Sequence, residues 1–227
     1  MSLQIATVSR VPEILKAIFA LGPDQRAMVY DVEWEEYESL LDELEGSPGK
    51  RVYYDEGTLD ILSVGFGHER RKESLARMVD VLAEESEREL VPAGSLTLKL
   101  KRLRKGAEPD SCFFIRNADQ MIKKDDYDLR HDPPPDLVIE VDITHPSHSK
   151  FDIYASLGVS EFWRYSGSRI EIFELIDGEY VEQDISPAFP FVRAEELSRF
   201  LDDYVSKSNL AANRAFRDFV RPRLQAS

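Results

Sequence analysis

Residues 136–143, with the sequence DLVIEVDI, constrain the fold more than any other part of the chain. Five of these eight residues are Leu, Val or Ile, and three prolines at 133–135 precede them, which predicts a buried strand. A helix is predicted over 147–158, with Ser147 as its N-cap and Gly158 as its stop. A buried strand that leads into a helix is typical of α/β domains.

The remaining segments predict further strands and helices around this unit. Residues 50–62 predict a hairpin that turns at Asp55-Glu56-Gly57, and residues 160–185 predict an antiparallel meander. Segments 95–103 and 111–117 are expected to be neighbouring strands, and 123–135 a surface loop. Apolar spacing predicts helices at 31–46, 67–89, 194–205 and 210–224. The expected fold is therefore an α/β sheet with parallel and antiparallel parts and helices on its faces.

Composition limits the classes of function. The net charge of −14 argues against a protein that coats nucleic acid through bulk electrostatics. The one local cluster of positive charge, KLKRLRKG at 99–106, is interpreted as the solvated face of an edge strand. Cys112 is the single cysteine, and no continuous apolar stretch or export signal is visible, so a cytoplasmic protein is expected.

Two carboxylates interrupt the predicted strand. Side chains alternate between the two faces of a strand, so Glu140 and Asp142 project from the same face. Burying such a pair costs several kcal/mol unless a cation, a basic group or water compensates. The face is therefore exposed, or neutralised by Arg or Lys, or part of a functional site. Asp110 before one predicted strand and Lys150 after another supply the remaining groups that phosphodiester hydrolysis needs.

Several segments resemble one known family, in the same order along the chain: RVYYDEGTLDIL at 51–62, GHERRKESL at 67–75, EPD at 108–110 and PDLVIEVDITHPSHSKFDIYASLGVSEFWRY at 135–165. The chain is similar to the bacterial restriction endonuclease family that is expanded in cyanobacteria, within the PD-(D/E)xK restriction-endonuclease-like superfamily. The similarity covers roughly residues 31–200. It implies a restriction-endonuclease-like mixed central sheet flanked by helices. The expected organisation is a helical extension at 1–30, a nuclease-like domain at 31–204 and a helical extension at 205–227.

The resemblance also implies a metal site. Asp110 matches the first aspartate of the superfamily and Glu140 its second acidic residue, with the Val141 carbonyl as a further ligand of Mg²⁺ or Mn²⁺. The superfamily signature has lysine where this chain has Asp142, so Lys150 on the following helix is the expected replacement.

Four further residues accompany this expected site. Glu69 is expected to complete the metal shell, and His68 is either a phosphate contact or a helix-end residue. Asp142 either binds metal or pairs with Lys150. Tyr154 lies one helical turn after Lys150 and either supports the lysine or packs in the core.

The sequence thus predicts a metal-dependent endonuclease that acts on nucleic acid, with DNA as the expected substrate and a homodimer as the expected assembly. Two alternatives remain open. The first is a non-catalytic module of the same fold that binds nucleic acid or protein. The second is a metal-dependent phosphoesterase that acts on a small substrate.

Overall fold

The computed structural model describes residues 10–47, 49–143 and 149–225. Its strands form two sheets. The first sheet contains, in spatial order, β1 (Gln25–Val29), β3 (Thr58–Ser63), β2 (Lys50–Asp55), β6 (Lys105–Ala107) and β5 (Leu98–Leu100). The second contains β11 (Glu179–Gln183), β10 (Ile170–Ile176), β9 (Glu161–Tyr165), β8 (Leu137–Val141), β7 (Ser111–Phe114) and β4 (Val91–Gly94).

The first sheet is antiparallel throughout. Its outer face packs against α1 (Val11–Ala20) and α2 (Trp34–Leu44). The predicted hairpin is confirmed as β2 and β3, joined by Glu56 and Gly57. Both loop residues have positive φ, 46° and 103°, as a tight two-residue hairpin requires. The expected N-terminal helical extension contains α1 and also strand β1, which pairs with β3.

The second sheet is mixed. Its strands pair in antiparallel fashion except β8 and β9, which are parallel and joined through α5 (Ser149–Leu157). The predicted strand and following helix are thus confirmed, and α5 ends at Gly158, whose φ is +82°. The expected N-cap, Ser147, lies outside the described residues. The predicted meander is confirmed as β9, β10 and β11.

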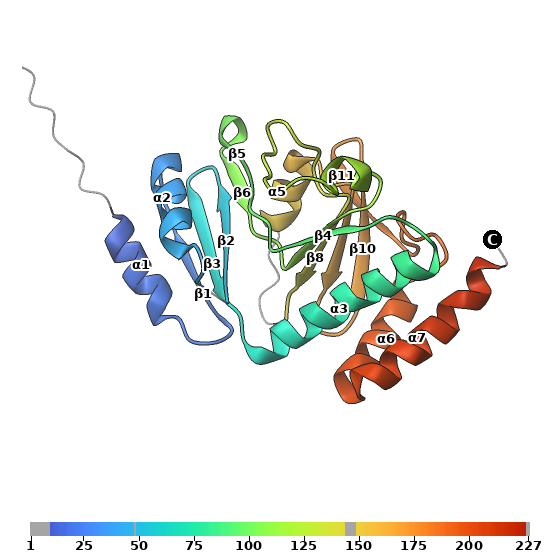
Figure 1. Cartoon of the computed structure of the whole chain (residues 1–227). Coiled ribbons are helices and arrows are strands. Elements are labelled where there is room, and N and C mark those ends of the chain that lie inside the picture. The colour runs from blue at the N-terminus through green and yellow to red at the C-terminus, as the bar shows by residue number, and fades with distance from the viewer. Residues whose placement is uncertain (1–9, 48, 144–148, 226–227) are drawn as a thin grey trace, which may run out of the picture.

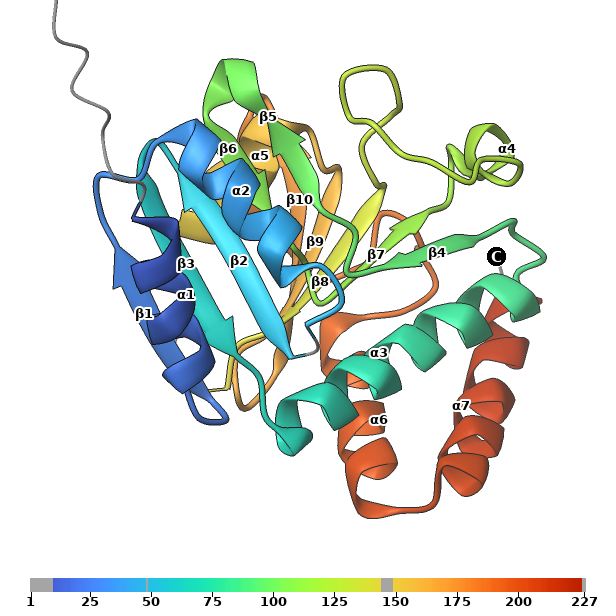
Figure 2. The ribbon, with the colours of Figure 1, turned by 60° about the vertical axis from the view of Figure 1, so that its left-hand side comes forward.

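Figures 1 and 2 show the layers of sheets and helices, and three apolar cores hold these layers together. One lies between α1, α2 and the first sheet, and a second lies around α5 between the two sheets. The third joins the far face of the second sheet to three helices, α3 (Phe66–Glu85), α6 (Ala194–Ser206) and α7 (Asn209–Leu224). α5 and the residues packed around it form a central layer between the two sheets. One face of β8 points toward β2 across this layer.

The predicted α/β class is confirmed, although the strands divide between two sheets where one central sheet was expected. The expected pairing of segments 95–103 and 111–117 is wrong. The first segment forms only the short strand β5 and a 3₁₀ turn (Lys101–Leu103), and β5 pairs with β6 in the first sheet. The second segment forms β7, which lies between β4 and β8 in the other sheet. The unexpected strand β6 takes the place beside β5.

Segment 99–106 lies at an edge of the first sheet, as interpreted from the sequence, and acids of α2 partly neutralise it. Loop 123–135 connects the short helix α4 (Ala118–Met121) to β8. None of the helices within the described residues is long and apolar enough to cross a bilayer.

Candidate active site between the two sheets

A cluster of buried charged residues lies between the two sheets. Strand β2 contributes from the first sheet, and β8 and the residue before β7 contribute from the second. The start of α3 and the first turn of α5 complete the cluster. The cluster contains Arg51, Tyr53, His68, Glu69, Asp110, Glu140, Asp142, Lys150 and Tyr154.

Glu140 is at the centre of this cluster and is fully buried. The Tyr53 hydroxyl donates to both carboxylate oxygens, at 3.1 and 2.9 Å, and the Tyr154 hydroxyl donates to Oε1. Burial raises the pKa of both tyrosines, so both hydroxyls keep their protons and act as donors. Burial also raises the pKa of Glu140 to about 7, with the carboxylates of Asp110 and Asp142 adding to the effect.

Lys150 joins the two carboxylates of the strand. Its Nζ lies 2.9 Å from Glu140 Oε2 and 2.8 Å from Asp142 Oδ1, and it is 4.6 Å from the centre of the Tyr53 ring. Burial alone would lower the pKa of Lys150, but the three nearby carboxylates outweigh it and raise the pKa. Lys150 therefore stays protonated. Of the alternatives stated for the acidic face, neutralisation by a lysine is observed and solvent exposure is wrong.

The Asp110 carboxylate is contacted by three groups from different elements. Its Oδ2 accepts a hydrogen bond from the Val141 backbone N–H at 2.8 Å, and Oδ1 accepts from Arg51 Nε at 3.1 Å. His68 Nε2 lies 3.0 Å from Oδ2 but is not aligned for a hydrogen bond. Burial would raise the pKa of Asp110, yet His68, Lys150 and Arg51 together lower it to about 2.

Glu69 lies at the rim, with its side chain 37% exposed. It accepts a hydrogen bond from Arg51 at 3.1 Å, and Lys72 also contacts it. Arg51 therefore bridges Glu69 and Asp110, two of the expected metal ligands. The predicted residues Asp110, Glu140, Asp142 and Lys150 meet in one place.

Arg51 and Tyr53 belong to the site, but the sequence reasoning did not select them. Arg51 and Tyr53 lie on one face of β2, whereas Val52 and Tyr54 lie on the other face and point to the apolar core beneath α2. The sequence contains one signal for them: the basic and the aromatic residue stand at positions i and i+2 of the predicted hairpin strand, so their side chains share one face of it. Tyr154, expected either to support the lysine or to pack in the core, packs in the core around α5, and its hydroxyl donates to Glu140.

The residues present fit a divalent cation in their chemistry. Three buried carboxylates face two buried permanent cations, Arg51 and Lys150, and Asp142 Oδ2 is buried without a hydrogen-bond partner. Within the described ranges, no three side chains of His, Cys, Asp or Glu are arranged so that together they could hold a metal ion. Mg²⁺ does not need such a set, because it uses one or two carboxylates, substrate oxygens and water. The Asp110 and Glu140 carboxylates and the Val141 carbonyl are donors of this type.

Comparison with known proteins gives a family match. A model of the family Uma2, described as "Putative restriction endonuclease", matches residues 34–203. A crystal structure of a "putative nuclease belonging to DUF820" from Anabaena variabilis is similar to this chain, with 16% identity and a TM-score of 0.47. That similarity covers 71% of this chain and 98% of the other. No curated protein matches the chain with significant similarity.

Proposed function

The chain belongs to the family Uma2, described as "Putative restriction endonuclease", and from this premise we propose that it is a Mg²⁺- or Mn²⁺-dependent endonuclease that hydrolyses phosphodiester bonds of nucleic acid, with DNA as substrate. One observation carries the proposal. Lys150 Nζ contacts Glu140 at 2.9 Å beside the Asp110 carboxylate, although Lys150 lies on a helix and not on the strand. That a lysine and two carboxylates lie together supports the proposal, despite Asp142 at the position where the superfamily signature has lysine.

In this proposal Asp110, Glu140 and the Val141 carbonyl hold the metal, with Glu69 completing its shell from the rim. When bound, the metal supplies positive charge to the phosphoryl oxygens. Lys150 is protonated, so it cannot remove a proton from the attacking water. It instead orients that water or stabilises the negative charge of the transition state.

The groups around the lysine fix its position. Tyr53 and Tyr154 hold the Glu140 carboxylate from two sides. Asp142 pairs with Lys150 and keeps it charged in a buried place. His68 lies close enough to Asp110 to contact a phosphate that approaches the same carboxylate.

The test is cleavage of supercoiled plasmid and of single-stranded DNA with Mg²⁺ or Mn²⁺. Wild type is compared with Asp110→Asn, Glu140→Gln and Lys150→Met, and we expect each variant to lose at least ~100-fold in rate. Glu161→Gln is the matched control, because Glu161 is a buried, hydrogen-bonded carboxylate of the same sheet outside the site. Circular dichroism confirms that each variant is folded at the assay temperature.

Metal binding has its own measurement. Mg²⁺ or Mn²⁺ should raise the melting temperature of wild type, and Glu140→Gln should abolish the rise. Inactivity on both DNA substrates without any such rise would favour the non-catalytic module. Cleavage of a small phosphodiester but of neither DNA would favour the small-substrate phosphoesterase.

A two-fold dimer is part of the proposal. If the substrate is a duplex, cleavage of both of its strands by one site per chain needs two copies that face opposite strands. Light scattering of the protein at assay concentration tests this arrangement, and a monomer that linearises plasmid in a single binding event would contradict it.

A further inference from the structure

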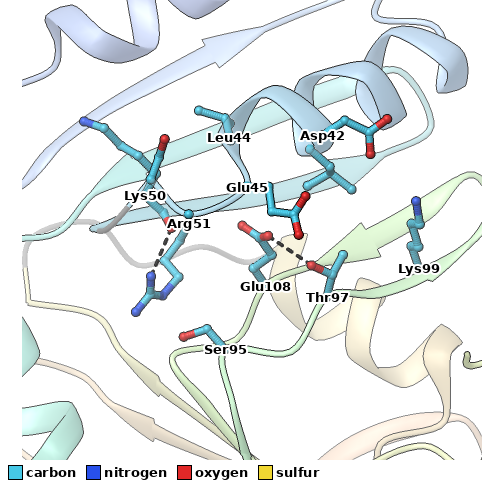
Figure 3. A pocket seen from close by; sticks show the side chains of 12 residues that line it. Asp42, Leu44, Glu45, Lys50, Arg51, Ser95, Thr97, Lys99 and Glu108 are labelled. Carbon is cyan, nitrogen blue, oxygen red and sulfur yellow. Dashed lines mark hydrogen bonds between the residues drawn. The ribbon is translucent and has the colours of Figure 1, made fainter. Parts of the chain in front are cut away.

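A hollow of about 560 Å³ opens beside the candidate active site (Figure 3). It lies between the C-terminal end of α2, the start of β2 and the segment that leads into β5. Its volume is within the ~300–1,000 Å³ that small-molecule sites occupy. Its lining includes Leu44, Glu45, Arg51, Ser95, Thr97 and Glu108.

This hollow, here called the α2 pocket, touches the active site through two of its lining residues. Arg51 Nε donates to the Asp110 carboxylate, while its Nη1 donates to the Lys50 carbonyl at the pocket wall. Ser95 Oγ donates to the Asp110 backbone carbonyl at 3.2 Å. A molecule in the α2 pocket would therefore lie next to a group that contacts Asp110.

Both polar and apolar side chains line the pocket, and its charged side chains balance in sign. Three acids and three bases contribute to it, namely Asp42, Glu45, Glu108, Lys50, Arg51 and Lys99. Glu108 Oε1 accepts a hydrogen bond from Thr97 at 3.1 Å, and burial raises the pKa of Glu108. The carboxylates of Glu45 and Glu108 point toward one another in Figure 3. Such a lining suits a flat, neutral ligand with both donors and acceptors better than a free anion or a metal ion.

We propose that the α2 pocket receives one unpaired nucleobase of the substrate strand, next to the phosphate that is cleaved. The substrate is then a single-stranded or locally unpaired nucleic acid. This inference rests on the proposed function, since it takes the phosphate to lie at Asp110. A base inside a duplex cannot enter a pocket of this kind without leaving its stack.

The surface around the pocket agrees with an unpaired strand. Duplex binding draws on a row of lysines and arginines that neutralise phosphates. The basic segment at the edge of the first sheet does not offer such a row, because three of its side chains pair with acids of the neighbouring α2 region. The pairs are Lys99 with Glu38, Lys101 with Glu35 and Arg104 with Glu33. Together with the net charge of −14, this pairing disfavours a long duplex.

The experiment compares two tryptophan substitutions, one within α2 at Glu43 and one just after its end at Glu45. Glu45→Trp places an indole at the pocket, whereas Glu43→Trp makes the same change of charge and size at an exposed residue that does not line it. Cleavage is measured on a short labelled single strand. It is also measured on a series of the same strand in which one nucleotide is abasic, at a different position in each member. We expect Glu45→Trp, but not Glu43→Trp, to lower kcat/KM at least ~5-fold, and one abasic position to do the same to wild type.

A binding measurement separates this inference from the proposed function. Titration of wild type with the four deoxynucleoside monophosphates should shift the NMR amide signals of Ser95 and Thr97, and Glu45→Trp should suppress the shifts. Cleavage that is insensitive both to Glu45→Trp and to every abasic position would overturn the pocket assignment while leaving the nuclease intact. If no DNA is cleaved, the absence of these NMR shifts overturns the inference, and their presence supports base binding by the pocket alone.

Discussion

Removal of the Lys150 charge should destabilise the protein strongly, and the magnitude follows from its contacts. Lys150→Met keeps most of the apolar stem but leaves Glu140 and Asp142 buried without the cation that lies 2.9 and 2.8 Å away. Breaking a buried ion pair at one partner costs ~3–5 kcal/mol, and here one lysine serves two carboxylates. With a urea m-value of ~3 kcal/mol/M, the unfolding midpoint should fall by about 1–1.7 M.

The loss should depend on pH in a defined direction. Burial raises the pKa of Glu140 to about 7 from its ordinary 4.5, so between these values the folded state binds more protons than the unfolded state. Stability from this group therefore falls as pH rises from 4.5 through 7, and loss of Lys150 extends that fall to higher pH. Lys150→Met should be closer to wild type at pH 5.5 than at pH 8.

Urea unfolding followed by tryptophan fluorescence at both pH values checks this result. Lys123→Met, at an exposed lysine, is the control and should stay within ~0.5 kcal/mol of wild type. Adding Glu140→Gln to Lys150→Met should recover part of the stability, because one uncompensated charge is removed. A loss below ~1 kcal/mol at pH 8, with no change at pH 5.5, would refute the buried ion-pair cluster.

Three further predictions concern the neighbouring groups. The pKa of Asp110 is lowered to about 2 from 3.8, so its contribution of about 2 kcal/mol to the free energy of unfolding is present above pH 3.8 and is lost as pH falls through 2. Asp110→Asn should therefore reduce the fall in stability at acid pH in denaturation curves. Tyr53→Phe keeps the ring beside Lys150 but loses the hydroxyl that donates to Glu140, so it should lower the free energy of unfolding in urea by ~1.5–3 kcal/mol. Tyr30→Phe, at an exposed tyrosine, is the control, and an equally small loss for Tyr53→Phe would contradict the hydrogen bond. Arg51→Met removes the cation shared by Asp110 and Glu69, so NMR titration should show a higher pKa for Asp110, and an unchanged value would contradict the contact.

The local elements followed from the sequence because their signals are local. The tight turn at Glu56 and Gly57, the apolar run of β8 and the stop at Gly158 each depend on a few adjacent residues. The division into two sheets did not follow, because it depends on which edge the β5–β6 hairpin joins. β6 is only three residues long and includes Gly106, so it lacks the alternation that marks a strand.

The site was predicted in part for a similar reason. Glu140 and Asp142 share a face of one strand, and Lys150 follows within the same strand–helix unit, so spacing and resemblance were enough to select them. Arg51 and Tyr53 come from the other sheet, and Tyr53 is separated from Glu140 by 87 positions in the sequence. Their role depends on packing between the sheets, which periodicity within one strand does not report.

The composition of the central layer indicates chemistry more than stability. Five charged side chains are buried there, namely Arg51, Asp110, Glu140, Asp142 and Lys150. Well-packed apolar residues in place of a buried ion pair are often neutral or stabilising by 1–4 kcal/mol. The same layer is apolar elsewhere around α5, so the fold already holds the two sheets together by apolar packing. Charges that this packing does not require, gathered beside the α2 pocket, support the proposal that these residues serve a reaction.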